Sequence, residues 1–236
     1  MENDELNLKK IEIDSKKRIA ILTYNQPHRK TYDTICLLKS KGYKNVIVYS
    51  QAMTYKKKKY PLISHRPELI MNIPEPKILC ANLGYEYIEG NFDNIEESKN
   101  TIFLLCGAGI LPDSFITKYK IINSHPGYIP FARGLDAYKW SVYNNLPIGV
   151  TTHFLGEYVD AGEVIERREI QIGEWDTFHA VSQKIYENEI DMLVHAIELI
   201  DEPHIYIIPE TDKIFKRMPE KLEKELFTKF DKLRNK

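Results

Sequence analysis

Hydrophobic residues alternate along the chain between short continuous runs and runs with helical spacing. The strand-like runs are Arg18–Tyr24, Asn45–Ser50, Tyr85–Gly90, Thr101–Gly107 and Lys120–His125. Helical patterns lie between them at Arg29–Lys41, Pro74–Gly84 and Pro112–Tyr119. This alternation predicts an α/β fold, a Rossmann-like, mostly parallel sheet with helices on both faces.

The second half of the chain has a different pattern. Apolar and polar residues alternate in Gly149–Leu155 and Gly162–Ile172, which predicts two strands near a sheet edge. Helices are expected at Ala137–Asn144, Trp175–Ile200 and Glu220–Arg234, with a loop or hairpin at Pro209–Met218. The last helix carries an apolar stripe, Leu222, Leu226 and Phe230, which can pack on the body of the protein or form a homodimer contact.

These patterns divide the chain into three parts. Residues 1–16 are polar and read as an N-terminal extension. Residues 17–205 contain the alternating elements and form the expected catalytic domain. Residues 206–236 form a short C-terminal loop and helix.

Polar side chains collect at the ends of the predicted strands, where open α/β sheets bind ligands. Asn123 and His125 end one strand, His153 lies in a later one, and Asp160 stands in the turn that follows it. Each also has an ordinary structural interpretation, since asparagine and aspartate favour turns and a single histidine is more often structural than catalytic. Because all four residues occur in this order and spacing, a shared functional site explains them better than four separate structural roles.

The combination resembles the signature of the formyltetrahydrofolate-dependent formyltransferases. That family has an Asn-x-His-Pro motif, a proline-containing loop, and then a His-x₆-Asp-x-Gly segment. Here these are the motif beginning at Asn123, the loop at Pro130, and the segment from His153 to Gly162. The resemblance covers roughly residues 18–172, and it implies the family's fold and its chemistry.

In that chemistry an amine attacks the formyl carbon of N10-formyltetrahydrofolate, the expected cosubstrate. The resemblance assigns the three catalytic roles to Asn123, His125 and Asp160. Asn123 and His125 would donate to the oxyanion that forms, and Asp160 would accept the amine proton or raise the basicity of the imidazole. No covalent enzyme intermediate and no metal is required.

Contacts to the cosubstrate and to the acceptor are assigned from the same resemblance. The glycine-rich stretch after the fourth predicted strand resembles the family's folate-binding loop, and the predicted cosubstrate contacts are Leu104, Cys106, Gly107, Gly109, Ile110, Leu111, Gly156 and Val159. The predicted acceptor contacts are Tyr128, Arg133, Gly134, Tyr138, Trp140 and His153. The aromatic rings can equally be core residues, and Arg133 can equally form a loop salt bridge.

Charge and loop composition narrow the acceptor. The formal net charge is −1, and no sizeable basic domain follows the catalytic part, which argues against tRNA and other nucleic acid as partners. The stretch after the first strand, YNQPHRKTYD, has no glycine, unlike the phosphate-cradling loop of the enzyme that formylates glycinamide ribonucleotide. An amino sugar carried on a nucleotide is the expected acceptor, and phosphoribosylglycinamide is the alternative.

Other classes of function stay open at this stage. His125, His153 and Asp160 are two imidazoles and a carboxylate, the ligand set of a non-haem metal site. A catalytically inactive folate- or nucleotide-sugar-binding protein is a second alternative. NAD binding is disfavoured because no GxGxxG follows the first strand.

The remaining composition gives weaker information. Cys36, Cys80 and Cys106 have no CxxC spacing, and Cys106 is expected to be a small core residue. The N-terminus lacks secretory character, and the longest apolar run, Ile102–Leu111, is too short to span a bilayer. The sequence therefore predicts a cytoplasmic protein without membrane partners.

Overall fold

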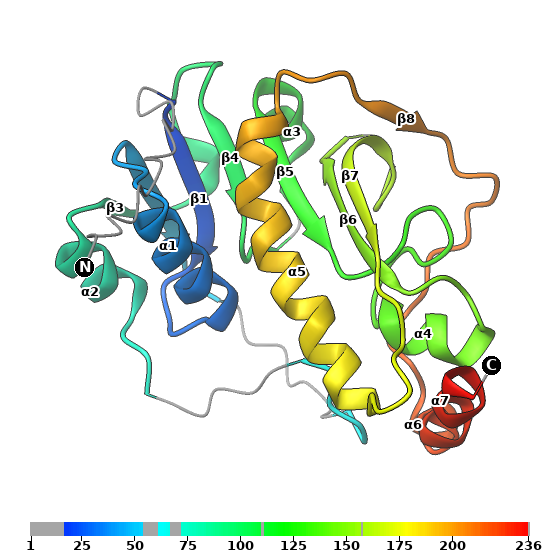
Figure 1. Cartoon of the computed structure of the whole chain (residues 1–236). Coiled ribbons are helices and arrows are strands. Elements are labelled where there is room, and N and C mark those ends of the chain that lie inside the picture. The colour runs from blue at the N-terminus through cyan, green and yellow to red at the C-terminus, as the bar shows by residue number, and fades with distance from the viewer. Residues whose placement is uncertain (1–16, 54–60, 67–71, 110, 157, 236) are drawn as a thin grey trace, which may run out of the picture.

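The computed structural model describes residues 17–53, 61–66, 72–109, 111–156 and 158–235, so the predicted extension 1–16 lies outside the described residues. One sheet organises the chain, with the strand order β3-β2-β1-β4-β5-β6-β7-β8 (Figure 1). The strands are β1 Ile19–Tyr24, β2 Val46–Gln51, β3 Glu86–Glu89, β4 Ile102–Leu105, β5 Lys120–His125, β6 Gly149–Phe154, β7 Gly162–Glu169 and β8 Ile205–Ile207.

The first five strands pair in parallel, and β6, β7 and β8 continue the sheet in antiparallel pairs. The predicted mostly parallel sheet is therefore confirmed. The two later strands do lie near an edge, but the edge itself is β8, which the sequence analysis missed. Only three residues form β8, and this length is too short to give an alternating pattern.

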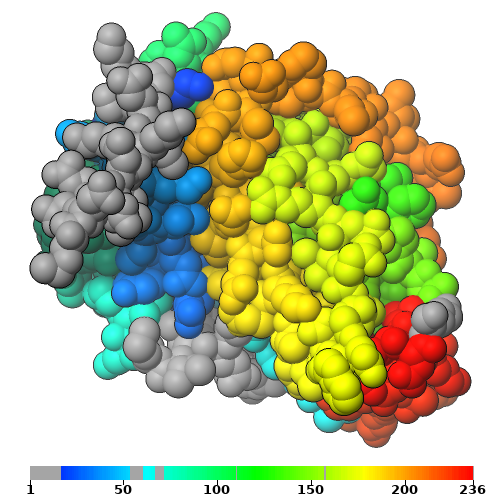
Figure 2. Space-filling view, viewed as in Figure 1, coloured from blue at the N-terminus to red at the C-terminus, as the bar shows by residue number. Residues whose placement is uncertain are grey.

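Successive side chains of each central strand enter different cores. In β1, Ile19 and Ile21 pack on the face covered by α1 (Arg29–Ser40), α2 (Pro76–Leu83) and α5 (Phe178–Leu199). Ala20 and Leu22 pack on the opposite face with Phe92 of η1 (Phe92–Asn94) and Phe115 of α3 (Asp113–Lys118). Helices therefore cover both faces, as predicted. The long helix α5 crosses the sheet in Figure 1, and α1 lies beside it on the surface in Figure 2.

A third core joins the C-terminal part to the sheet. The predicted helix Glu220–Arg234 is two helices, α6 (Glu220–Glu223) and α7 (Leu226–Arg234), because the turn tightens where the Glu225 amide donates to the Leu222 carbonyl oxygen three residues earlier. Leu226 and Phe230 are buried with residues of α4 (Ala137–Asn144) and α5. The apolar stripe was predicted either to pack on the body of the protein or to form a homodimer contact. Leu226 and Phe230 pack on the body of the protein.

A buried ion pair ties α6 to α4. Lys139 of α4 and Glu223 of α6 are both enclosed and in contact, and the second carboxylate oxygen of Glu223 accepts from the Leu62 amide at 2.6 Å. In the described part of the chain, no helix has the length and apolarity needed to cross a membrane.

Candidate active site

Strand β5 projects Asn123 and His125 to the same face of the sheet, because residues two apart on a strand share a face. The antiparallel register places His153 of β6 directly opposite Asn123. The amide Nδ2 of Asn123 lies 3.3 Å from Nε2 of His153. The antiparallel pairing of β5 and β6 therefore brings Asn123 and His153 together although they lie 30 residues apart in the sequence.

His153 is a completely buried neutral imidazole. Its Nδ1 donates to its neighbour's carbonyl oxygen, that of Phe154, at 2.9 Å, which leaves Nε2 as an acceptor for the Asn123 amide. Burial lowers the pKa of His153 to about 4, although the nearby Asp160 carboxylate acts in the opposite direction. In this tautomer His153 orients Asn123, and one amide hydrogen of Asn123 stays available to a ligand.

Asp160 reaches the same point from the loop between β6 and β7. Its backbone has φ 45°, an uncommon conformation for a residue other than glycine. One carboxylate oxygen lies 3.6 Å from Nδ1 of His125 and 3.8 Å from Nε2 of His153. The other accepts from the Gly134 amide at 2.9 Å.

The imidazole of His125 has a fixed orientation. Its Nε2 lies 2.9 Å from the Ala132 carbonyl oxygen, which can only accept, so Nε2 carries a hydrogen and Nδ1 faces Asp160. Gly127 keeps this arrangement possible, since a Cβ there would lie 2.5 Å from Nε2 of His125 and 2.4 Å from the Ala132 oxygen. Asn123 and His125 of β5 and Asp160 of the loop between β6 and β7 therefore converge on one point.

That point opens into a cleft of about 780 Å³ beyond the carboxyl ends of β4 and β5. The cleft is lined by all three residues together with Leu105, Cys106, Gly107 and Ala108 after β4, and by Gly134, Leu135 and Asp136 before α4. Cys106 is buried in the lining, and burial raises the pKa of its thiol to about 11, which keeps the thiol protonated.

A charged cluster that the sequence analysis missed lies at the α1 and α5 side of this cleft. Glu189 is buried between Lys30 of α1 at 2.9 Å and Arg66 at 2.7 Å. Burial alone would raise the pKa of Glu189, but these two cations hold it below its usual value. Glu189 follows Ile185 and precedes Leu193 by four residues on the buried stripe of α5, and a carboxylate in that stripe was the available signal.

The C-terminal segment forms another wall. Phe215 pairs with Gly134, exchanging hydrogen bonds of 2.8 Å with the Arg133 carbonyl oxygen and the Leu135 amide. The ring of Trp140 stacks on Phe215 with centroids 4.9 Å apart, and its Nε1 donates to the carbonyl oxygen of Lys216 at 2.7 Å. The segment is thus fixed to the loop whose Gly134 amide holds Asp160.

Arg133 strengthens this connection. Its guanidinium is buried and donates to the carbonyl oxygens of Val159 at 2.9 Å and Thr211 at 3.0 Å. It therefore ties the Asp160 loop to the C-terminal segment. Its donors are directed at backbone carbonyl oxygens, which differs both from the predicted acceptor contact and from the alternative of a loop salt bridge.

The structure brings part of the predicted contact set to the cleft. Cys106, Gly107, Gly134 and Val159 line it, with the three catalytic candidates. Tyr138 and Leu104 are enclosed in the core, and such positions leave no surface for a ligand. The remaining predicted residues that are described but are not among those lining the cleft are Gly109, Leu111, Tyr128, Arg133, Trp140, His153 and Gly156; Ile110 lies outside the described residues.

The described residues contain no group of three or more histidine, cysteine, aspartate or glutamate side chains that could hold a metal ion.

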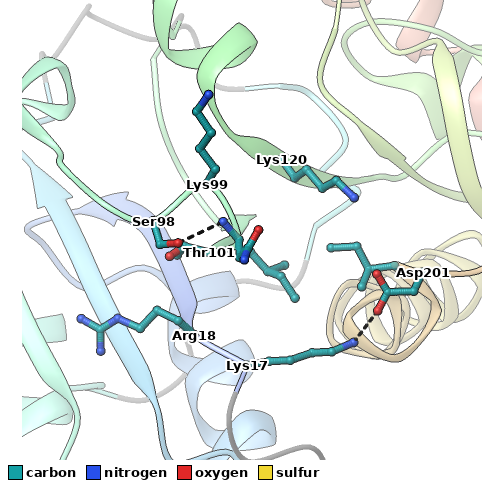
Figure 3. A pocket seen from close by; sticks show the side chains of 10 residues that line it. Lys17, Arg18, Ser98, Lys99, Thr101, Lys120 and Asp201 are labelled. Atoms are coloured by element: carbon teal, nitrogen blue, oxygen red, sulfur yellow. Dashed lines mark hydrogen bonds and ion pairs between the residues drawn. The ribbon is translucent and has the colours of Figure 1, made fainter.

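A second pocket, of about 450 Å³, lies at the amino ends of the same strands (Figure 3). Lys17 contacts Asp201 there at 3.1 Å, and Arg18 pairs with Glu86 and Glu97. Lys99 and Lys120 also line this pocket.

The family comparison agrees with this geometry. Residues 17–197 match the Formyl transferase family, and the chain belongs to that family. The match ends within α5, so neither β8 nor the C-terminal wall of the cleft is part of it.

Relatives with known names include enzymes with different acceptors. The chain is 30% identical over 124 residues to a methionyl-tRNA formyltransferase of Desulforamulus reducens, covering 51% of this chain and 39% of the relative. It is 28% identical over 89 residues to a dTDP-4-amino-4,6-dideoxyglucose formyltransferase of Mycobacterium bovis, covering 38% of each. The aligned regions span less than half the length of these relatives.

Solved structures share the fold. An N-formyltransferase from Helicobacter canadensis, in complex with folinic acid and dTDP-3-aminofucose, superposes with a TM-score of 0.57 at 16% identity, covering 91% of this chain and 80% of that one. A glycinamide ribonucleotide transformylase from Symbiobacterium toebii gives 0.55 at 18% identity, covering 80% and 89%.

Proposed function

We propose that this protein transfers a formyl group from N10-formyltetrahydrofolate to the amine of an amino sugar carried on a nucleotide. The convergence of Asn123, His125 and Asp160 at one point of an open cleft is the observation that supports the proposal most strongly. Membership of the formyl transferase family supports the reaction type.

The first step is attack by the neutral amine on the formyl carbon. The carbonyl π pair moves to the oxygen, and a tetrahedral intermediate with a negative oxygen forms. The free amide hydrogen of Asn123, held by His153, donates to this oxygen, and His125 donates from Nδ1 when that nitrogen is protonated. One such donor is commonly worth about 3 kcal/mol of transition-state stabilisation.

The second step moves a proton and breaks a bond. The attacking nitrogen becomes positive and loses its proton toward Asp160, directly or through water. The bond between the carbon and N10 then breaks, its electron pair goes to N10, and a proton is delivered there. The proton lost by the amine balances the one gained by N10, so no oxidant or reductant is consumed.

The acceptor class is inferred from the composition of one loop. Structures with this fold include a sugar enzyme bound to a dTDP-sugar and a glycinamide ribonucleotide enzyme, so the fold alone does not choose between them. The loop after β1 lacks the glycines of a phosphate cradle, which favours the nucleotide sugar. Glycinamide ribonucleotide is the alternative acceptor.

A substrate panel tests the proposal. The protein is incubated with N10-formyltetrahydrofolate and, separately, with aminated nucleotide sugars, glycinamide ribonucleotide and initiator methionyl-tRNA, and products are read by mass spectrometry. Gain of one formyl unit on an aminated nucleotide sugar is expected. Formylation of the ribonucleotide or of the tRNA alone would overturn the assigned acceptor.

A chelator experiment tests the alternative of a metal-dependent enzyme. Treatment with EDTA should leave transfer unchanged in this direct-attack scheme. Loss of activity that added iron restores would instead favour the metal-dependent alternative.

A further inference from the structure

The charges that line the catalytic cleft do not balance. Three carboxylates line it, and each already has partners. Glu189 pairs with Lys30 and Arg66. Asp160 accepts from a backbone amide and faces an imidazole, as described above. The carboxylate of Asp136 accepts from the Met218 amide at 2.9 Å and lies 3.8 Å from His65.

Two cations lining the cleft have no carboxylate partner among the described residues. They are Lys216 and Arg217, adjacent exposed residues of the C-terminal wall. Lys30 and Arg66, the other cations of the lining, share Glu189. The cations of the lining that have no carboxylate partner therefore lie in the C-terminal segment, outside the region matched by the family.

The backbone that carries these two cations is fixed. Phe215 before them is paired with Gly134, Trp140 donates to the Lys216 carbonyl oxygen, and Met218 after them donates to Asp136. A segment anchored at each end of a two-residue stretch presents its side chains from a constant position, so less ordering entropy is lost when a ligand binds.

Arg217 also acts electrostatically on another part of the lining. His65 is part of the lining, and its pKa is lowered to about 3, mainly by burial and further by the charges of Lys139, Arg66 and Arg217. Arg217 and Arg66 thus act on the same region of the cleft from two different segments. With the imidazoles counted as neutral, four cations and three carboxylates line the cleft, so its lining has a net positive charge.

We propose that Lys216 and Arg217 form an anion subsite that binds the diphosphate of a nucleoside-diphosphate acceptor. The proposal rests on the proposed function for the identity of the acceptor. Charge-assisted hydrogen bonds from lysine and arginine suit phosphate oxygens, and arginine can bind two of them at once. A subsite here would replace the glycine cradle that the loop after β1 lacks, and it would make the C-terminal segment a determinant of acceptor choice.

The test combines steady-state kinetics with direct binding. Lys216→Ala, Arg217→Ala and the double variant are compared with the wild-type protein. The Michaelis constants for acceptor and formyl donor are measured separately, and dTDP, UDP and GDP are titrated by calorimetry. In the double variant we expect the acceptor KM and the Kd of the preferred nucleoside diphosphate to rise about tenfold or more, with kcat and donor KM within about twofold.

Lys213→Ala is the matched control. Lys213 belongs to the same segment but does not line the cleft, so removal of its charge should leave both constants unchanged. The double substitution Lys216→Arg, Arg217→Lys should retain most of the affinity because both charges remain.

Each outcome has a definite consequence. Unchanged acceptor KM and unchanged nucleoside-diphosphate affinity in the double variant overturn the subsite. A rise in donor KM alone also overturns it, since the bound anion would then be the glutamate tail of the folate. If the wild-type protein formylates no nucleotide sugar but binds a nucleoside diphosphate that the double variant releases, the subsite stands and only the proposed acceptor falls.

Discussion

The two ends of the same parallel strands carry pockets of very different quality. At the carboxyl end, side chains from β5 and from the β6–β7 loop point at one another, and two cations have no carboxylate partner among the described residues. At the amino end, Lys17 pairs with Asp201 (Figure 3), and Arg18 pairs with Glu86 and Glu97. Lys99 and Lys120 of this pocket also have no carboxylate partner among the described residues, but no set of polar side chains converges beside them. A cavity and a cluster of basic residues are present at both ends, so neither feature identifies a site. A site is identified by polar side chains that converge and still have hydrogen-bond donors or acceptors free for a ligand.

The largest effect that would test this contrast is expected at Asp160. Asp160→Asn keeps the shape of the side chain but removes the proton acceptor, so kcat should fall by about 10²–10⁴. Affinity for the formyl donor, measured by calorimetry, should stay within a few-fold of the wild-type value. Near-normal turnover would remove Asp160 from the mechanism and weaken the distinction between the two ends.

A smaller effect is expected where the C-terminal wall meets the Asp160 loop. In Gly134→Ala the new Cβ would lie 2.3 Å from the Phe215 carbonyl oxygen, at a residue with φ 93°. We expect turnover to fall by roughly tenfold or more and stability by about 1–3 kcal/mol, measured by kinetics and urea denaturation. Gly156→Ala, between β6 and β7 and with open space around its Cβ position, should be nearly neutral.

The buried imidazole of His153 makes stability depend on pH. Its folded pKa of about 4 lies below the unfolded value of about 6.5, so the unfolded chain binds more protons between these values. Stability is therefore full above about pH 6.5 and falls as the pH drops toward 4, by on the order of a few kcal/mol. His65, with a pKa of about 3, acts in the same direction.

Urea denaturation of the wild-type protein and of His153→Asn at pH 7, 5.5 and 4.5 measures this dependence. The variant should lose less stability over that range, because one of the two imidazoles with a lowered pKa is gone. An identical loss in both proteins would show that His153 does not cause it.

No effect on transfer is expected at the amino end. Lys99→Ala and Lys120→Ala remove cations from the second pocket, and both KM values should remain within about twofold of wild type. A tenfold change in the acceptor constant would mean that the second pocket participates, and the contrast between the two ends would fail.

The sequence was sufficient for strands β1 to β7 of the sheet and for the three converging residues. Asn123 and His125 share a strand face and lie at a strand end, and both facts follow from a period of two. The sequence did not show Lys30, Arg66 and Glu189 as a cluster, because their contacts join α1, a loop and α5, which are far apart in the chain.

Aromatic residues near the motif were the least predictable. Tyr138 is buried against Phe178, and Trp140 stacks on Phe215. A ring beside a catalytic motif packs in the core or against a ligand according to which way its helix turns. That direction depends on tertiary contacts, here with residues 40 or more positions later, and no local pattern records it.

The position of Phe215 has a practical consequence. A gene shortened to the stretch that resembles its family, ending at residue 197, would still encode Asn123, His125 and Asp160. Its product would lack the partner of Gly134 and the carbonyl oxygen of Thr211 that Arg133 holds, and one side of the reaction chamber would be open to bulk water. Under the acceptor-binding role proposed for Lys216 and Arg217, exchange of residues 208–219 between relatives should change which acceptor is used while the chemistry stays the same.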